Sequence, residues 1–464
     1  MTLALHPDRL FPTDPTLRAI ARRLFAQIEH LPLICPHGHT DPAWFAVNEC
    51  FSNPTELLIL PDHYVRRMLV SQGIQVLDMC DSNGTPDFRA VWRTFAQNYH
   101  LFDGTPTRIW LDHTFVDLFG LNVALSSETA DLIYDQITEC LAQDAFRPRA
   151  MAERFNIEVI TTTEGPIDVL NHHKAIAQSG WTTRVISAYR PDAVIDPETP
   201  GFLSNLIAFG ECSGEDTGNW RGYLKAHRNR RAYFAQMGAT STDHGHPSAQ
   251  TCNLSKAEAE ALFDKVKSGR STPQDNEIFR GQMLTEMARM SLDDGMVMQL
   301  HVGSFRNHSP ITFNRFGGDQ GFDIPRPTSY VSALKPLLDQ IGMDPRLSLI
   351  LFTLDETAYS RELAPLAGVY PSIKLGPAWW YYDSPSGMMR YREQVTETAG
   401  FYNTVGFNDD TRALPSIGAR HDMARRVDCA YLAGQVGQHM MSEDAASWIA
   451  HDLAYGLAKK AYKL

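Results

Sequence analysis

The segment LPLICPHGH (residues 31–39) combines a short apolar run with two histidines at its end, and it sets the pattern for the whole chain. Seven further β-rich runs follow it: IEVITTTEG (157–165), WTTRVISAYR (181–190), GATSTDHG (238–245), MVMQLHVG (296–303), RLSLILFTL (346–354), SIKLGPAWW (372–380) and TVGFNDDTR (404–412). Their length and apolar content predict buried strands, and most of them end in polar or aromatic residues. The sequence therefore predicts a series of buried strands, most of which end in residues that can bind a ligand or take part in catalysis.

Segments with helical apolar spacing, such as VSALKPLLDQIG, separate most of these runs. Strands that alternate with helices favour parallel βαβ units, and eight such units predict a closed (β/α)8 TIM barrel. An open doubly wound sheet is the alternative. We favour the barrel because it brings the polar strand ends to one mouth, where active sites of such barrels lie.

A long interval separates the first two predicted strands. Residues 45–150 read as helices punctuated by proline and glycine. We expect a helical insertion after strand 1 that covers the barrel mouth. No linker or internal repeat interrupts the chain, so we expect residues 1–464 to form a single barrel domain that includes this insertion.

The composition limits the classes of partner. With 42 Lys+Arg and 54 Asp+Glu, the formal charge is −12, which argues against nucleic acid and anionic membranes. No stretch approaches the ~18 apolar residues that a membrane span requires. Seven cysteines without a CxxC pair fit free thiols in a reducing compartment. We therefore expect a cytoplasmic protein, and the sequence is compatible with a homo-oligomer without naming an interface.

Two strand ends predict a metal site. Side chains at i and i+2 of a strand point the same way, so His37 and His39 can converge on one ion. Strand 8 of a closed barrel lies beside strand 1 and ends in Asp409-Asp410, so a carboxylate there is within reach of the two histidines, although either aspartate can also form a turn or a helix cap. His301 on strand 5 is either a further ligand, a substrate contact or a structural histidine. Imidazole and carboxylate ligands fit Zn²⁺ best, with Mn²⁺ and Fe²⁺ left open.

The same mouth carries positive charge and aromatic rings. Arg190, Arg306 and Arg412 follow strands 3, 5 and 8, and together they predict an anionic substrate, because guanidinium binds carboxylates in a bidentate manner. Trp379 and Trp380 end strand 7. We expect one of the two rings to face the mouth, where it can pack on a sugar, and the other to face the core.

The His-x-His motif with an aspartate at strand 8 resembles the amidohydrolase superfamily. The details resemble the uronate isomerase family over nearly the whole chain, in the segments CPHGHTDP (35–42), PDHYVRRML (61–69), TSTDHG (240–245), MQLHVGSFRN (298–307), GGDQGFD (317–323), LGPAWWYYD (375–383) and DDTRALPSIGARHDMARR (409–426). Strand 2 departs from the family pattern, with TTTEGPID at its end. We therefore assign no catalytic role to Glu164.

The resemblance implies roles for individual residues. The metal ligands would be His37, His39 and Asp410, and the catalytic groups would be Asp410, Arg412, Tyr64 and His63. The resemblance further implies that Arg190 anchors the sugar acid and that Trp380, with Trp379, forms an aromatic wall. His301 and Arg306 are expected to contact substrate beside them.

The implied reaction converts D-glucuronate to D-fructuronate and D-galacturonate to D-tagaturonate through a cis-enediol. The partner would then be a small-molecule hexuronate. Two other readings are open. One is a zinc-dependent hydrolase of the same superfamily that acts on a lactone, ester or amide. The other is a non-catalytic protein that binds sugar acids.

Overall fold

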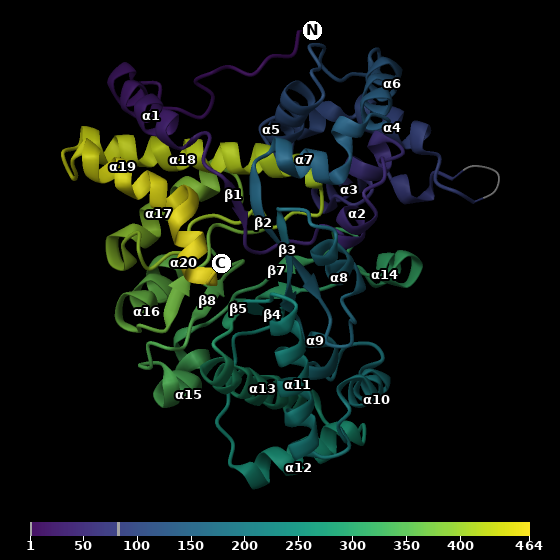
Figure 1. The fold of residues 1–464 in the computed structure, drawn as a ribbon, viewed down its shortest axis with the longest axis vertical. Coiled ribbons are helices and arrows are strands. Elements are labelled where there is room, and N and C mark those ends of the chain that lie inside the picture. Colours follow the sequence, from purple (N-terminus) through teal and green to yellow (C-terminus); the bar gives the residue numbers. More distant parts are fainter. Residues whose placement is uncertain (1, 81–83) are drawn as a thin grey trace.

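A curved parallel sheet forms the centre of the molecule (Figure 1). The computed structural model describes residues 2–80 and 84–464, and within them seven parallel strands pair in the order β1-β2-β3-β4-β5-β8-β9. Their bounds are β1 (Leu33–Cys35), β2 (Ile157–Glu164), β3 (Arg184–Tyr189), β4 (Ser241–His244), β5 (Val297–His301), β8 (Leu349–Phe352) and β9 (Ile373–Leu375). Each of the first seven predicted runs contains one of these strands.

The eighth barrel position is filled by an irregular segment. Thr404 makes a single parallel bridge to Leu375, and the backbone N–H of His39 donates to the carbonyl of Thr411 at 3.1 Å. Residues 404–411 therefore lie between β9 and the end of β1 and close the (β/α)8 barrel. The prediction of a regular strand over 404–412 is wrong, because Gly406 (φ +78°) and Asp410 (φ +41°) adopt left-handed conformations that interrupt an extended chain.

The alternation of side chains along β5 explains how the barrel directs functional groups. Met298 and Leu300 pack outward into the main core beneath the surrounding helices. Val297, Gln299 and His301 have the opposite parity and face the barrel interior. Val297 packs there in a cluster with Tyr462 near the C-terminus, whose hydroxyl lies 3.2 Å from the side-chain oxygen of Gln299. His301 is the last residue of the strand and so reaches the mouth.

Helices connect the strands and cover the outside of the barrel. They are α8 (Asn171–Gln178), α9 (Asp192–Ile195), α10 (Phe202–Ser213), α11 (Trp220–Gln236), α12 (Lys256–Lys267), α13 (Pro273–Asp294), α14 (Pro310–Phe316), α15 (Val331–Ile341), α16 (Ala364–Val369) and α17 (Pro385–Ala399). A π-helical turn, η6 (Tyr359–Leu363), precedes α16, and a short antiparallel pair, β6 (Ser304–Phe305) and β7 (Ile324–Pro325), follows β5. Helix α13 shows how local sequence sets the ends of a helix. Thr272 and Asp275 form a capping box at its start, and Gly295 ends it with a φ of +78°.

The interval between β1 and β2 is helical, as expected for the insertion. It contains α2 (Pro42–Val47), η1 (Thr55–Ile59), α3 (His63–Ser71), η2 (Val76–Asp78), α4 (Phe88–Gln97), η3 (Tyr99–Phe102), α5 (Pro106–His113), η4 (Thr114–Leu118), α6 (Ala130–Leu141), η5 (Asp144–Phe146) and α7 (Pro148–Arg154). These helices share a core of aromatic rings, including Trp92, Phe95 and Phe115. Burial of these rings stabilises the insertion as a compact part of the fold.

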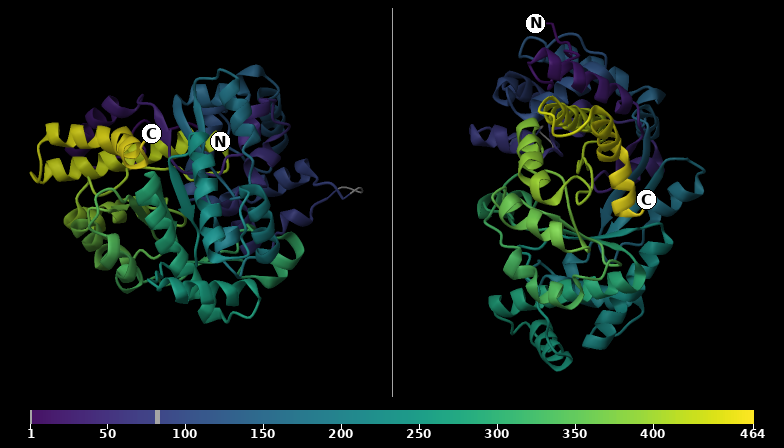
Figure 2. Two further views of the ribbon diagram at one scale, coloured as in Figure 1. Left: turned by 60° about the horizontal axis from the view of Figure 1, so that its bottom comes forward. Right: turned by 90° about the vertical axis from the view of Figure 1, so that its left-hand side faces the viewer.

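The two ends of the chain pack together. Helix α1 (Pro15–Ile28) contacts α18 (Ile417–Gly437) and α19 (Glu443–His451), and the views in Figure 2 show the purple N-terminal helix beside the yellow C-terminal ones. A short turn, η7 (Leu414–Ser416), leads into α18. The C-terminal segment continues from α19 through a π-helical turn, η8 (Asp452–Gly456), into α20 (Leu457–Tyr462). Among the described residues, no helix is both long and apolar enough to span a membrane.

Candidate active site at the barrel mouth

A cavity of about 770 Å³, including the space open to solvent at its mouth, lies at the carboxyl ends of the strands. Every predicted site residue lines it, namely His37, His39, His63, Tyr64, Arg190, His301, Arg306, Trp379, Trp380, Asp410 and Arg412. The barrel supplies most of these side chains, and α3 of the insertion supplies two. The fold therefore brings residues from nearly the whole length of the chain to one opening.

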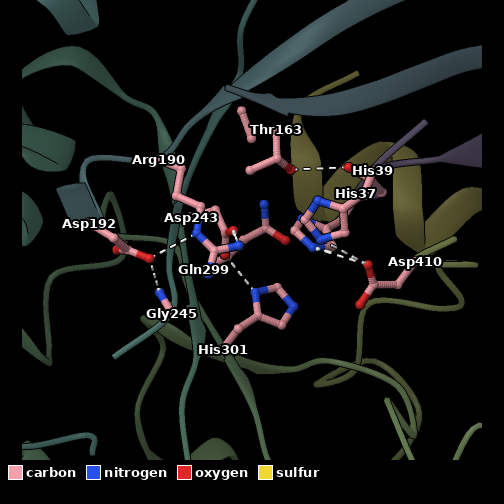
Figure 3. A network of polar contacts seen from close by, with 12 residues as sticks. His37, His39, Thr163, Arg190, Asp192, Asp243, Gly245, Gln299, His301 and Asp410 are labelled. Atoms are coloured by element: carbon pink, nitrogen blue, oxygen red, sulfur yellow. Dashed lines mark hydrogen bonds and ion pairs between the residues drawn. The ribbon is translucent and has the colours of Figure 1, made fainter. Parts of the chain in front are cut away.

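The metal cluster, which we define as His37, His39, His301 and Asp410, lines this cavity, and Figure 3 shows the four side chains. The Oδ1 atom of Asp410 is 3.5 Å from Nε2 of His37 and 3.4 Å from Nε2 of His39. Ligand atoms of His37, His301 and Asp410 all lie within 4.8 Å of one another. Regular pairing of β1 ends at Cys35, so the two histidines stand in the loop after the strand rather than within it. They nevertheless converge on the same carboxylate oxygen.

Burial and neighbouring charges hold the cluster in the protonation states that bind metals. Burial lowers the pKa of His39 to about 3 and also lowers the pKa of His37, so both imidazoles are neutral at pH 7. Burial alone would raise the pKa of Asp410, but the adjacent His37 and His39 outweigh it and lower that pKa to about 2. The Oδ1 atom of Asp410 and the Nε2 atom of His301 are buried without a hydrogen-bond partner. Such unsatisfied groups fit a divalent cation.

Asp410 is held by an unusual backbone conformation and by a tryptophan. Its φ of +41° turns the side chain back toward the histidines, and the indole Nε1–H of Trp379 donates to its Oδ2 atom. Trp379 is nearly buried and also packs edge-on to His301, at 4.7 Å between ring centroids. Trp380 is more exposed and faces the cavity. Both rings line the cavity, but Trp379 also packs in a buried core cluster with Phe352 and Leu354, in keeping with the expectation that one of the two rings faces the core.

A buried carboxylate fixes the orientation of His301. Asp243 at the end of β4 is fully buried, and its Oδ1 lies 2.6 Å from Nδ1 of His301. Although burial raises the pKa of Asp243, the nearby Arg190 guanidinium holds it well below the usual range, so the carboxylate accepts and His301 Nδ1–H donates. The lone pair of Nε2 then faces the metal cluster. The other Asp243 oxygen is 3.1 Å from Nη1 of Arg190.

The three predicted arginines each have a carboxylate partner outside the metal cluster. Arg190 also contacts Asp192 at 2.8 Å. Arg412 lies 3.1 Å from Asp319, and Arg306 lies 2.8 Å from Asp323 and 5.2 Å from the centre of the Trp380 ring. These pairs leave the guanidinium groups oriented along the cavity wall. A carboxylate-bearing ligand can share them with their protein partners.

Helix α3 presents His63 and Tyr64 at its first turn. Asp62 caps the helix by accepting from the backbone N–H groups of Tyr64 and Val65, which fixes the direction of both side chains. The His63 ring lies 6.2 Å from that of Trp380. Burial, reinforced by Arg412, lowers the pKa of His63 to about 3, so this imidazole is neutral.

Asp383 and Arg420 line the same cavity, and neither was predicted as a site residue. The Tyr64 hydroxyl donates to Asp383 at 2.6 Å, and Arg420 approaches the other carboxylate oxygen at 3.2 Å while stacking 3.6 Å over Trp110. Burial raises the pKa of Tyr64 well above its usual value. The available signals were a lone aspartate after Trp-Trp-Tyr-Tyr and an arginine near the start of α18. Neither has a spacing that predicts the contact.

The fold and this site define an α/β-barrel enzyme of the amidohydrolase type, with a group of residues suited to a metal ion. A family model described as Glucuronate isomerase matches residues 15–462. The chain belongs to this family, and it is therefore an isomerase.

Individual relatives agree with this assignment. The chain is 62% identical over 467 residues to a uronate isomerase of Xanthomonas axonopodis pv. citri, with 100% of this chain and 99% of that protein covered. It is 60% identical over 465 residues to a uronate isomerase of Rhizobium meliloti, with 99% of each covered. The crystal structure of glucuronate isomerase from Caulobacter crescentus superimposes with a TM-score of 0.98 at 58% identity, covering 100% of this chain and 98% of that one.

Proposed function

We propose that the protein interconverts the aldose and ketose forms of hexuronates, D-glucuronate with D-fructuronate and D-galacturonate with D-tagaturonate. The observation that carries this proposal is one cavity that joins the metal cluster to Arg190, Arg306 and Arg412. A sugar acid needs both features, because its carboxylate must be bound and its carbonyl end must be activated. The printed names of relatives at about 60% identity agree with this substrate class.

We propose that Arg190 holds the C6 carboxylate and that Trp380 packs against the sugar chain. Arg190 is paired with Asp192 and Asp243, so its side chain is rigid before substrate arrives. A rigid anchor orients the reacting end at low entropic cost. Arg306 would contact the substrate from the loop that follows β5, whereas His301, which lies with His37 and Asp410, is proposed as a metal ligand.

His37, His39, His301 and Asp410 would hold one divalent cation, which we propose to be Zn²⁺. The imidazole and carboxylate ligands and the neutral state of the histidines support this choice. When bound, such an ion supplies Lewis acidity to a substrate oxygen. The protein's own contribution is to orient the ligands through Trp379 and Asp243.

The reaction requires that a proton leaves C2 and that a proton reaches C1. We propose that the ionised Asp410 takes the C2 proton from the open-chain aldose, while O1 is protonated to give the cis-enediol. Asp410 then returns the proton to C1, and loss of the O2 hydroxyl proton forms the ketone at C2. Arg412 lies beside the cavity where negative charge develops on these oxygens and would stabilise it.

Tyr64 is better suited to donate a proton than to remove one from carbon. Burial and the adjacent Asp383 carboxylate raise its pKa, so the phenol is protonated at neutral pH. We propose that Tyr64 donates its proton to O1 and recovers one from the O2 hydroxyl, with neutral His63 beside it as a hydrogen-bonding group. The proton count of the protein is then unchanged after one turnover.

We further propose that the whole chain acts as one barrel domain in a reducing compartment such as the cytoplasm, with residues 45–150 as a helical subdomain over the mouth. All seven cysteines lie within the described residues and are free thiols. His63 and Tyr64 from the insertion reach the same cavity as the barrel residues. Both observations support the proposal.

Incubation of the purified protein with D-glucuronate in D₂O, followed by proton NMR, tests the function. We expect ketose signals and deuterium at the carbon that receives the proton. Ketose without deuterium would support the isomerase activity but would show that the proton carried by Asp410 does not exchange with solvent during turnover. Acid release from a lactone or ester, with no ketose from glucuronate or galacturonate, would overturn the isomerase in favour of a hydrolase.

A further inference from the structure

The tripeptide His-Gly-His occurs twice in this chain, each time at the end of a barrel strand. One copy is residues 37–39 after β1, and the other is residues 244–246 at the end of β4. The rings of the first copy are 5.2 Å apart with an interplanar angle of 84°, and those of the second are 5.9 Å apart at 85°. The second copy therefore reproduces the arrangement of a histidine pair that converges on a carboxylate.

A carboxylate also faces the second pair. The Nε2 atom of His246 lies 3.6 Å from Oδ1 of Asp192, close to the 3.4 Å between His39 and Asp410. This separation is too long for a good hydrogen bond. It fits two ligands on a common ion, since bonds of ~2.0–2.1 Å in tetrahedral geometry put neighbouring ligand atoms ~3.3 Å apart.

Four polar atoms of this second cluster (Asp192, His244 and His246) are buried and lack a hydrogen-bond partner among the described residues. His244 is fully buried and His246 is 2% exposed. Within residues 2–80 and 84–464, no hydrogen-bond partner lies beside Nδ1 of His244, either ring nitrogen of His246 or Oδ1 of Asp192. Buried groups of this kind are costly unless something binds them. Their ligand atoms lie within 4.8 Å of one another.

The surroundings prepare these atoms for a cation. The Nε2 atom of His244 lies 3.1 Å from the hydroxyl of Thr242, and donation to that oxygen leaves the lone pair of Nδ1 free. Arg190 keeps Asp192 ionised, and Asp192 and Asp243 together carry one more negative charge than the single guanidinium between them. A cation would balance this excess.

We propose that Asp192, His244 and His246 form a second divalent-cation site of the zinc type, separate from the metal cluster that lines the cavity. The ligand atoms would be Oδ1 of Asp192, Nδ1 of His244 and Nε2 of His246. The site is structural, because these residues do not line the substrate cavity.

The bound ion would fix Arg190 through Asp192. The other oxygen of Asp192, Oδ2, accepts from Nε of Arg190 at 2.8 Å and from the backbone N–H of Gly245 at 2.9 Å, as Figure 3 shows. A Cβ at Gly245 would lie 1.9 Å from Nη2 of Arg190, so the glycine lets the guanidinium pack against the tripeptide. The ion, Asp192 and Arg190 thus form one connected unit behind the substrate cavity.

Metal counting tests the site. The protein is stripped with a chelator, reloaded with Zn²⁺, desalted and measured by inductively coupled plasma mass spectrometry. We expect two ions per chain in the wild type, one in His246→Gln, one in His39→Gln and two in His113→Gln, a control at a half-buried histidine outside both clusters. One ion in the wild type that is retained in His246→Gln and lost in His39→Gln would overturn the proposal.

A measurement on the unmodified protein covers the case in which His246→Gln does not fold. Crystals of the zinc-loaded wild type are measured at the zinc absorption edge, and we expect an anomalous peak between Asp192, His244 and His246. Density without anomalous signal would identify a water and overturn the site. The link to Arg190 rests on the proposed function and is tested separately. It predicts a several-fold higher KM for glucuronate in His246→Gln, and an unchanged KM would remove the link while leaving the metal count intact.

Discussion

The indole N–H of Trp379 donates a hydrogen bond to one oxygen of Asp410, while the other oxygen of the same carboxylate faces His37 and His39. The tryptophan thereby selects which oxygen is left for a metal ion. Groups that orient a metal ligand in this way commonly change metal affinity by ~10–100-fold when removed.

We therefore expect Trp379→Phe to weaken Zn²⁺ binding by about 10–100-fold, because the freed carboxylate can rotate away from the histidines. Competition with a fluorescent chelator measures the dissociation constant. Trp380→Phe is the matched control, since Trp380 is the next residue in the sequence. We expect this variant protein to bind Zn²⁺ with the affinity of the wild type. Equal affinities for the two variants would remove Trp379 from the support of Asp410.

Arg412→Met should lower kcat by about 10²–10³-fold if the guanidinium stabilises charge in the transition state. Steady-state kinetics with D-glucuronate measures this loss. Arg315→Met is a suitable control, because Arg315 is also paired with an aspartate, Asp78, and does not line the cavity. A near-normal kcat in Arg412→Met would exclude the arginine from the chemical step.

Arg190→Met should act mainly on binding. Loss of a charge-assisted contact to the substrate carboxylate is worth roughly 1.5–3 kcal/mol, so KM should rise about 10–100-fold with a smaller change in kcat. Kinetic measurement over a wide range of glucuronate concentration separates the two constants. A fall in kcat at unchanged KM would assign Arg190 to the reaction and not to the anchoring of substrate.

Tyr64 and Asp383 should behave as one unit. Removal of the phenolic proton in Tyr64→Phe should lower kcat by about 10²–10⁴-fold. Asp383→Asn should also lower kcat, because the Tyr64 hydroxyl loses its carboxylate acceptor. The double variant should be little slower than Tyr64→Phe alone, and additive losses in this double-mutant cycle would show that the two residues act independently.

Glu164 predicts a pH dependence of stability. Burial raises its pKa from 4.5 to about 7, although the hydroxyls of Thr162 and Ser187 donate to it. The folded chain keeps this proton at pH values where the unfolded chain has lost it. The contribution of protonated Glu164 to the free energy of unfolding is therefore fully present below pH 4.5 and is lost as the pH rises through 7.

Glu164→Gln removes this titration. We expect the variant to gain roughly 2–3 kcal/mol of stability relative to the wild type between pH 5 and pH 8. Urea unfolding at the two pH values measures the difference. If the free energies of unfolding of the wild type and of Glu164→Gln change equally between the two pH values, the pKa of Glu164 is not raised by folding.

The sequence predicts most strands well because their apolar runs are buried on both faces. β2 and β5 lie within a few residues of the predicted runs 157–165 and 296–303. Residues 404–412 look like the other runs, but the left-handed conformation of Gly406 depends on packing against the C-terminal helices, where a Cβ would lie 2.8 Å from the carbonyl of Leu453. Such a constraint is tertiary, and a local pattern does not contain it.

Some residues of the candidate site can likewise be predicted from the sequence, whereas some contacts between them cannot. His37, His39 and a carboxylate at the end of the eighth predicted strand follow from the motif and from the closure of the barrel, and the family resemblance is what selects Asp410 over Asp409. The contact between Tyr64 and Asp383 is not predictable from the sequence, because it joins the first turn of α3 to the loop after β9. The two residues are far apart in the chain, and only the folded position of the insertion over the barrel brings them together. No short-range spacing encodes a contact of this kind.

The irregular segment that closes the barrel also sets the order in which the site is completed during synthesis. The two histidines after β1 leave the ribosome early, whereas Asp410 belongs to the last part of the chain to be made. Chains fold from the N-terminus during translation, so a nascent chain carries the histidine pair without its carboxylate. A metal-binding centre therefore forms only when the barrel closes, and a truncated product that lacks the final segment carries no complete centre.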